Sequence, residues 1–244
     1  MIRTVSLTKR FGDNTAVDGL DLDIVEGEFF CFLGPNGAGK TTTIKMLTGL
    51  MQPTSGTATI GGFDILSEPI KAKKLLGYIP DHPFLYEKLT GREFMHFVAG
   101  LYNMPGDRLD DDVDELLHTF EVGEVGDQLI ENYSHGMRQK LSFASCFVHR
   151  PKIVIVDEPW VGLDPKNIRA VKNYLKRKTR EEGLTVLMST HTLSIAEEIA
   201  DRIAIINFGK LLHVGTVGEI MNLEDSRDTL EEVFLELTKG NEVA

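Results

Sequence analysis

A glycine-rich segment near residue 40 has the spacing G-x-x-x-x-G-K-[ST], which is typical of loops that bind nucleotide phosphates. It consists of Gly34, Pro35, Asn36, Gly37, Ala38, Gly39, Lys40 and Thr41. Glycines let backbone N–H groups converge on phosphate oxygens, and a helix that follows adds its positive end. We expect Lys40 to hold the β and γ phosphates, Thr41 to offer its hydroxyl to Mg²⁺, and Thr42 to reach a phosphate oxygen. A plain glycine loop is the alternative, and the match of motif and context argues against it.

Two adjacent carboxylates, Asp157 and Glu158, directly follow the apolar run at residues 153–156. The end of a buried strand is where α/β folds place their ligands. We expect Asp157 to anchor Mg²⁺, directly or through water, and Glu158 to orient and polarise the attacking water as general base. A strand that ends in an ordinary polar turn is the alternative, and the phosphate-binding motif upstream makes it less favourable. The two motifs together predict hydrolysis of a nucleoside triphosphate.

Continuous apolar runs predict the strands that carry these residues. They lie at residues 29–33, 153–156, 185–188 and 203–206. The first leads into the glycine loop and a helix-compatible stretch at 41–50, and helical segments separate the other three. Runs that are apolar on both faces indicate buried parallel strands.

The rest of the chain has two other patterns. Apolar and polar residues alternate over 17–24, which is typical of antiparallel strands. From about residue 85 to 150 the pattern is helical, because apolar residues recur at three-and-four spacing, as at Phe94, Phe97, Val98 and Leu101. The sequence therefore predicts an α/β fold: a mainly parallel sheet, an N-terminal antiparallel β-subdomain and an inserted helical subdomain.

Composition excludes several other classes of protein. The 244 residues are 42% hydrophobic, enough to build a core, and 26 Lys and Arg against 37 Asp and Glu give a net charge of −11. No global positive field draws the chain to nucleic acid or anionic lipid. No apolar stretch is long enough to span a membrane, and the first residues lack a signal-peptide core, so we expect a cytosolic location. The two cysteines, Cys31 and Cys146, are expected to be reduced and buried.

Beyond the two motifs, the chain resembles the ATP-binding subunits of ABC transporters over nearly its whole length. Residues 133–139 are similar to the family's signature sequence, usually Leu-Ser-Gly-Gly-Gln: Ser134 and Gly136 match, while His135 and Met137 stand for a glycine and the glutamine. The resemblance implies that Ser134 and Gly136 contact the γ-phosphate of an ATP held by the opposite subunit. An ordinary helix N-cap at Ser134 is the alternative.

Two further segments match the family in the expected order along the chain. Residues 162–165, from Gly162 to Pro165, are similar to the D-loop that crosses the dimer interface, and Asp164 is its matching residue. His191, at the end of the next apolar run, aligns with the switch histidine that contacts the γ-phosphate and steadies the catalytic water. A structural histidine at a strand end is the alternative.

Three positions depart from the family pattern or stay open. Asp81 stands where a glutamine is expected; its oxygen can still bind Mg²⁺, but it is one methylene shorter and adds a negative charge. The aromatic residue expected to stack on adenine is Phe11, for which a packed turn residue is the alternative. Trp160, the single tryptophan, is expected either to report on the nucleotide or dimer state or to pack in the core.

The resemblance implies a P-loop NTPase (RecA-like) core and one ABC ATPase domain over residues 1–244. The nucleotide-binding core, together with the β-subdomain, is expected at residues 1–84 and 151–222. A helical subdomain that contains the signature segment is expected at 85–150. A C-terminal helix and tail are expected at 223–244. ATP and Mg²⁺ are the implied ligands. ATP binding would close a dimer of identical or related subunits, and hydrolysis would reopen it.

The implied partner is an integral membrane permease, with no nucleic acid, and the implied location is cytoplasmic, on the inner face of the cell membrane. The receiving surface is expected near residues 81–101, and residues 230–237 resemble the ending of exporter-type ATPases. Two alternatives remain: a soluble ABC-type ATPase that acts on nucleic acid or ribosomes, and a nucleotide-gated regulatory module with weak turnover.

Overall fold

Alternating apolar and polar residues build an antiparallel sheet at the start of the chain. The structure, a computed structural model, describes residues 1–160, 163–222 and 229–239. The sheet has the order β2-β1-β4-β5 and consists of β1 (Ile2–Phe11), β2 (Asn14–Ile24), β4 (Ser55–Ile60) and β5 (Phe63–Asp64). In β2, Val17, Leu20, Leu22 and Ile24 are buried, which confirms the antiparallel strands expected over residues 17–24.

The continuous apolar runs form a second, six-stranded sheet in the order β10-β9-β3-β8-β7-β6. Its strands are β3 (Phe29–Leu33), β6 (Leu76–Ile79), β7 (Ile153–Asp157), β8 (Thr185–Thr190), β9 (Arg202–Asn207) and β10 (Lys210–Gly215). All neighbouring strands pair in parallel except β10, which is antiparallel to β9. The carboxyl ends of β3, β8 and β7 therefore meet at one edge, where the expected phosphate and carboxylate residues follow.

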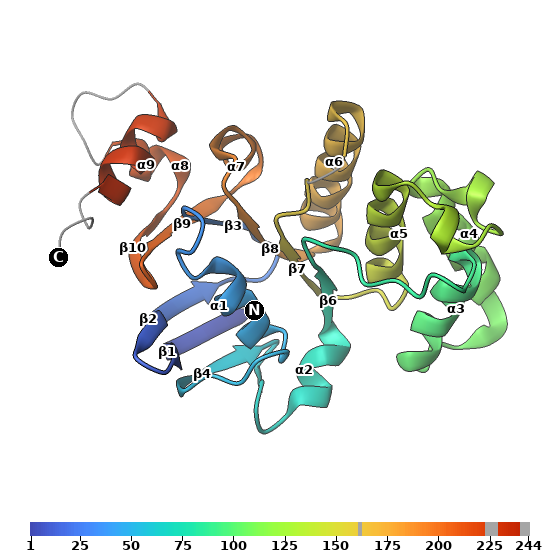
Figure 1. Cartoon of the computed structure of the whole chain (residues 1–244), viewed down its shortest axis with the longest axis horizontal. Helices are drawn as coiled ribbons and strands as arrows, with labels where there is room; N and C mark the ends of the chain where they lie inside the picture. Colours follow the sequence, from blue (N-terminus) through green and yellow to red (C-terminus); the bar gives the residue numbers. More distant parts are fainter. Residues whose placement is uncertain (161–162, 223–228, 240–244) are drawn as a thin grey trace.

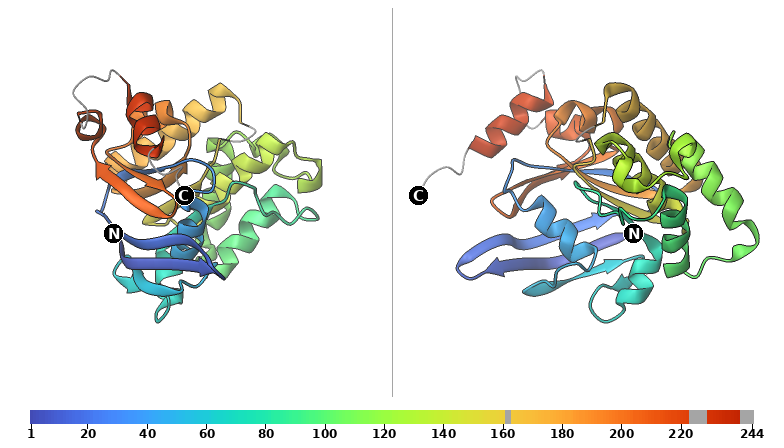
Figure 2. Two further views of the ribbon diagram at one scale, coloured as in Figure 1. Left: turned by 60° about the vertical axis from the view of Figure 1, so that its left-hand side comes forward. Right: turned by 45° about the vertical axis from the view of Figure 1, so that its right-hand side comes forward.

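Helices cover both faces of this sheet. Helix α1 (Lys40–Leu47) lies between the two sheets and contacts β2, β4 and β7, and its buried Ile44 and Leu47 join a core shared by both layers (Figure 2). The opposite face is covered mainly by α5 (His135–Phe147), α6 and α7 through a second core that includes Leu141, Leu175 and Ala196. The bounds of α2, α6 and α7 are Pro69–Leu75, Pro165–Glu182 and Leu193–Ile199.

Three helices, α3 (Gly91–Leu101), α4 (Leu109–Thr119) and α5 (His135–Phe147), pack against one another at one end of the molecule (Figure 1). Short 3₁₀ turns lie between them at Gly106–Arg108, Gly123–Val125 and Ile130–Asn132. Helix α3 starts with a capping box between Thr90 and Glu93, and α5 starts at Ser134, whose hydroxyl accepts a hydrogen bond from the Met137 N–H at 3.3 Å. The division of the chain at residues 85 and 150 stays a prediction.

The chain ends at the opposite side of the molecule with α8 (Val217–Met221) and α9 (Leu230–Lys239) (Figure 1). Of the C-terminal tail expected at 223–244, residues 223–228 and 240–244 lie outside the described residues. Among the helices that the structure describes, none combines the length and the apolar character needed to cross a bilayer. Cys31 and Cys146 are free and buried, as expected, and burial raises the pKa of both thiols.

Candidate nucleotide site

The glycine loop joins the end of β3 to the start of α1, as the motif predicts. Gly39 is the N-cap of α1 and has a φ of 108°, and a Cβ at this position would lie 2.5 Å from the carbonyl oxygen of Ala16. A Cβ at Gly34 would lie 2.4 Å from the carbonyl oxygen of Ile206. The loop is therefore held between β2 and β9, and both positions require glycine.

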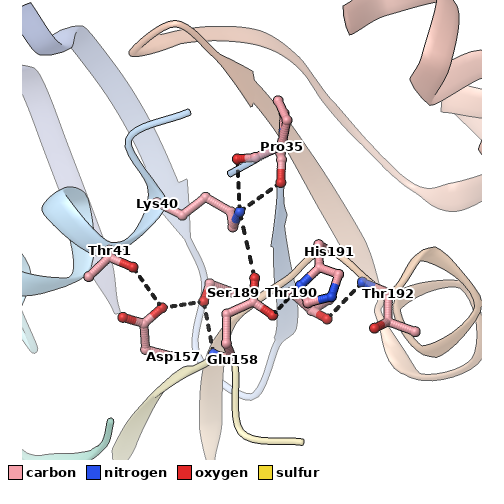
Figure 3. A network of polar contacts seen from close by, with 10 residues as sticks. Pro35, Lys40, Thr41, Asp157, Glu158, Ser189, Thr190, His191 and Thr192 are labelled. Carbon is pink, nitrogen blue, oxygen red and sulfur yellow. Dashed lines mark hydrogen bonds and ion pairs between the residues drawn. The ribbon is translucent and has the colours of Figure 1, made fainter. Parts of the chain in front are cut away.

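The ammonium group of Lys40 points back across this loop (Figure 3). Its Nζ donates hydrogen bonds to the carbonyl oxygens of Gly34 at 2.7 Å and Pro35 at 3.1 Å, and it lies 3.6 Å from Oε1 of Glu158. Burial lowers the pKa of Lys40, while the charges of Glu158 and Asp157 act in the opposite direction. This arrangement keeps a positive charge at the place where the motif puts phosphate oxygens.

Asp157 lies under the start of α1 with one carboxylate oxygen unpaired. Its Oδ1 accepts hydrogen bonds from Ser189 Oγ at 2.6 Å and Thr41 Oγ1 at 3.3 Å, and its Oδ2 is buried with no partner among the described residues. Burial raises the pKa of Asp157, and the negative charges of Asp81 and Glu158 add to this. An unpaired buried carboxylate oxygen beside a threonine hydroxyl fits the hard oxygen donor set that Mg²⁺ binds.

Glu158 has an unusual backbone conformation, with a φ of 45° in the left-handed region. Its N–H faces Ser189, with the carbonyl oxygen at 3.2 Å and Oγ at 3.1 Å, and its Oε2 lies 2.8 Å from His191 Nδ1. The structure thus brings together Lys40, Asp157, Glu158 and His191 (Figure 3). Strain at one residue of a polar cluster is a common feature of catalytic positions.

Phe11 ends β1 and is 48% exposed, so its ring is accessible. It pairs with Asn14, at the start of the strand whose Ala16 carbonyl abuts Gly39, and Lys9 Nζ lies 5.2 Å from the centre of its ring. This position places an accessible aromatic side chain in the hairpin whose second strand abuts the phosphate loop. Its role in stacking on adenine stays a prediction.

The residues expected to act on a second subunit lie on other helices. Ser134 and Gly136 are at the start of α5, and Asp164 is the N-cap of α6, where it accepts a hydrogen bond from the Asn167 N–H at 2.9 Å. That hydrogen bond lowers the pKa of Asp164. No hydrogen bond or ion pair of the described residues joins these three to the Lys40 cluster, and Gly162 of the expected D-loop lies outside the described residues.

Asp81 does not touch the cluster in this arrangement. Its carboxylate accepts a hydrogen bond from the His82 N–H at 2.8 Å and lies 3.0 Å from His82 Nδ1, although its charge contributes to the raised pKa of Asp157. Within residues 1–160, 163–222 and 229–239, no three His, Cys, Asp or Glu side chains gather as a ready metal site. A magnesium ion here would therefore take most of its ligands from phosphate and water.

Ser189 was not singled out from the sequence, yet it contacts both carboxylate residues. It pairs directly with Asp157 across the parallel strands β8 and β7, and this register places its hydroxyl on Oδ1. The sequence feature that could have identified Ser189 is its small polar side chain within an otherwise apolar strand, two positions before His191. A second unpredicted contact comes from Gln139, whose side chain reaches the turn after Glu158.

Comparison with known proteins decides the family. The model of the "ABC transporter" family matches residues 17–161. The chain belongs to the ABC transporter family. It is 39% identical to the uncharacterized ABC transporter ATP-binding protein YhcH of Bacillus subtilis over 98% of this chain and 76% of YhcH. It is 38% identical to the daunorubicin/doxorubicin resistance ATP-binding protein DrrA of Streptomyces peucetius over 90% of this chain and 66% of DrrA.

Solved structures agree with this assignment. An ATP-binding subunit of an ABC transporter superposes with a TM-score of 0.90 at 30% identity, covering 97% of this chain and 99% of the other. The dimeric ATP-binding cassette MJ0796 bound to ADP and Pi superposes with a TM-score of 0.81 at 25% identity, covering 89% and 99%. The P-loop NTPase fold is confirmed, and so is the prediction of an ATP-binding and ATP-hydrolysing transporter subunit.

Proposed function

We propose that this subunit binds Mg²⁺–ATP at the Lys40 cluster and hydrolyses it to drive transport through a separate membrane permease. The observation that carries the proposal is the unpaired, buried Oδ2 of Asp157, beside the Thr41 hydroxyl and below the loop that Lys40 spans. Backbone N–H groups of residues 36–42 and the ammonium group of Lys40 bind the phosphates, while Pro35 has no N–H to donate. The exposed ring of Phe11 stacks on the adenine.

Magnesium, when bound, neutralises charge on the β and γ phosphates. Thr41 Oγ1 and Asp157 Oδ2 would hold it, and Asp81 would be a further ligand if its contact with His82 were released. Such a site gives a role to the Asp157 carboxylate, which lies where burial raises its pKa and so disfavours its ionised form.

Glu158 is the general base of the reaction. Its Oε2 accepts a hydrogen bond from His191 Nδ1 in the tautomer that leaves His191 Nε2 as an acceptor, and its Oε1 faces Lys40. A water between the carboxylate and the γ-phosphate donates a proton to Glu158 as its oxygen attacks the γ-phosphorus, the bond from that phosphorus to the β–γ bridging oxygen breaks, and ADP leaves with the bridging oxygen. Lys40 stabilises the negative charge on the phosphoryl group, and His191 fixes the orientation of the base.

Ser134, Gly136 and Asp164 complete the site of a second ATPase subunit. Ser134 is exposed at the N-terminus of a 13-residue helix, which favours contact with a phosphate of another molecule. The dimeric arrangement of MJ0796 with ADP and Pi supports this assembly. Two ATP molecules then lie between two subunits, so that ATP binding closes the dimer and hydrolysis opens it.

An exposed apolar surface provides a place for the permease. Phe84, Tyr86, Phe97 and Leu101 are 85%, 59%, 40% and 65% exposed, whereas Phe94 is buried in the core. Next to it a cleft of about 260 Å³ opens between α1, β6, α3 and the end of α5, lined by residues such as Leu50 and Tyr102. Apolar surface beside a cleft suits an amphipathic segment of a partner. The name of DrrA as a resistance protein supports export as the direction of transport.

Affinity purification of the tagged chain from gently solubilised membranes tests this proposal. We expect a multi-span membrane protein to copurify in stoichiometric amount with the wild-type chain. Phe84→Ser, within the proposed surface, should lose this partner. The matched control Leu66→Ser should keep it, since Leu66 is another exposed apolar residue outside the proposed surface. Recovery of the wild-type chain only from the soluble fraction, with ribosomes, nucleic acid or no partner, would contradict the permease-coupled function.

A further inference from the structure

Gln139 connects the helix of the signature segment to the catalytic turn. It lies on α5, five residues after Ser134, and its side chain is fully buried. Its Nε2 donates a hydrogen bond to the carbonyl oxygen of Pro159 at 3.2 Å, and Pro159 directly follows Glu158. A carbonyl can only accept, so the amide nitrogen must face Pro159 and the amide oxygen must point away from it.

Two complementary polar groups, one on Gln139 itself and one on the residue after Pro159, lie unpaired. Oε1 of Gln139 is a buried acceptor, and Nε1 of Trp160 is a buried donor, each without a partner among the described residues. Trp160 follows Pro159 in the chain and packs against the same core as α5. Unpaired buried groups are costly, so a rearrangement of the turn that gives these two groups a partner is favoured.

The turn itself is strained and held from several sides. Glu158 has a left-handed φ of 45° directly before a proline, a conformation that the neighbouring structure must maintain. Ser189 holds its N–H side, and Gln139 holds the carbonyl of the next residue. A displacement of α5 therefore moves Pro159 and changes where the Glu158 carboxylate lies.

A second connection ties the same part of α5 to the residues after the turn. Lys140 lies 3.1 Å from Glu121, and Glu121 also lies 3.4 Å from Lys166 at the start of α6. These charges lower the pKa of Glu121. The first half of α5 therefore contacts the turn after Glu158 through Gln139. Through Lys140 and Glu121 it is also linked to the start of α6, the helix that Asp164 caps.

We propose that Gln139 is a positioning residue through which the state of the Ser134 segment sets the geometry of Glu158 in the same chain. This rests on the proposed function, in which Ser134 contacts the ATP bound by the second subunit. When that phosphate draws in the start of α5, Gln139 carries the movement to Pro159 and brings Glu158 into line for hydrolysis. Each subunit thereby couples its own general base to the nucleotide held by its partner.

Gln139→Met tests the proposal, because methionine keeps the length and volume of the side chain but cannot donate to Pro159. We expect kcat for ATP hydrolysis to fall about tenfold with KM for ATP changed by less than twofold. Trp160 is the single tryptophan, so its fluorescence reports on this turn without labelling. We expect its response to ATP to be present in the wild-type protein and lost in Gln139→Met.

Phe143→Leu is the matched control, one turn further along α5. Phe143 is buried and packs against Phe120 with ring centres 5.9 Å apart, so this variant loosens the same helix without touching Pro159. We expect it to lower Tm while keeping kcat and the Trp160 response. Equal kcat and fluorescence in Gln139→Met and wild type would overturn the proposal. If Gln139→Met and Phe143→Leu lose kcat in the same proportion to their loss of Tm, the effect is one of general stability, and this would also overturn the proposal.

Failure of the underlying dimer function gives a different result. In that case the wild-type protein itself shows no ATP-dependent dimer by light scattering and no Trp160 response to ATP. If the wild-type protein forms the dimer and gives the response, and Gln139→Met gives the same response, only the role of Gln139 is refuted.

Discussion

Replacing Glu158 by glutamine should separate ATP binding from ATP hydrolysis. The two carboxylate oxygens have different partners, since Oε1 lies 3.6 Å from Lys40 Nζ and Oε2 lies 2.8 Å from His191 Nδ1. An ammonium group only donates, so the amide oxygen of the glutamine turns to Lys40 and its NH₂ group faces His191. The imidazole then has to accept at Nδ1, with its proton on Nε2, which is the opposite of the tautomer that the carboxylate favours.

The size of the effect follows from these contacts. Loss of a positioned general base lowers the rate about 10²- to 10⁴-fold, or roughly 3–5 kcal/mol in the barrier. Exchange of a charge-assisted hydrogen bond for a neutral one changes the local energy by only about 1 kcal/mol. Lys40 still donates to the carbonyl oxygens of Gly34 and Pro35, so we expect the Kd for ATP to stay within about threefold of wild type.

Phosphate release measures hydrolysis, titration calorimetry measures the Kd for ATP, and light scattering detects the dimer that the variant should trap with ATP. Glu182→Gln is the matched control, because it removes the same charge from an exposed pair with Lys178 at the end of α6. It should keep full turnover. Turnover of Glu158→Gln above about one tenth of wild type would refute the assignment of Glu158 as general base.

Three further outcomes are expected. Lys40→Ala should raise the Kd for ATP at least about tenfold in calorimetry, because it removes the buried ammonium group, and an unchanged Kd would contradict the phosphate-loop assignment. Asp157→Asn should abolish Mg²⁺-dependent turnover yet raise the Tm of the nucleotide-free protein by about 2–4 °C, since the buried carboxylate is disfavoured when ionised. Folding raises the pKa of Asp157, so the wild-type carboxylate becomes protonated as pH falls toward 4 and its burial no longer destabilises the protein. The Tm difference between Asp157→Asn and wild type should therefore shrink over this range, and a difference that grows would refute the burial argument. Phe84→Ser should lose the copurifying permease without changing the Kd for ATP; retention of the permease would place its contact elsewhere.

Local sequence patterns predict most of the elements and the general position of the site. The apolar runs at residues 29–33 and 153–156 become the buried strands β3 and β7, and alternation over 17–24 becomes β2. Parallel strands place their carboxyl ends at one edge of a sheet, which explains why Lys40, Asp157 and His191 lie together there. Their convergence requires only that the three strands belong to one sheet.

The order of strands is not encoded locally, and this limits what can be predicted within the site. Strand β8 lies between β3 and β7, which places Ser189 directly beside Asp157. A serine in an apolar strand has no spacing or motif that identifies its neighbour on another strand. Asp81 shows the same limit, because its carboxylate contacts the adjacent His82 and the family pattern gave no sign of this pairing.

The backbone of Glu158 shows how long-range contacts determine the catalytic geometry. A left-handed residue other than glycine costs about 1–3 kcal/mol, so the conformation persists only because its neighbours hold it. Ser189 comes from the strand that ends near His191, which is expected to face the subunit's own nucleotide, while Gln139 comes from the helix that begins at Ser134. In the proposed dimer these two elements serve different nucleotide sites, so the position of Glu158 depends on both. We therefore expect Glu158 to be aligned for hydrolysis only when both sites hold ATP, which would link hydrolysis to closure of the dimer.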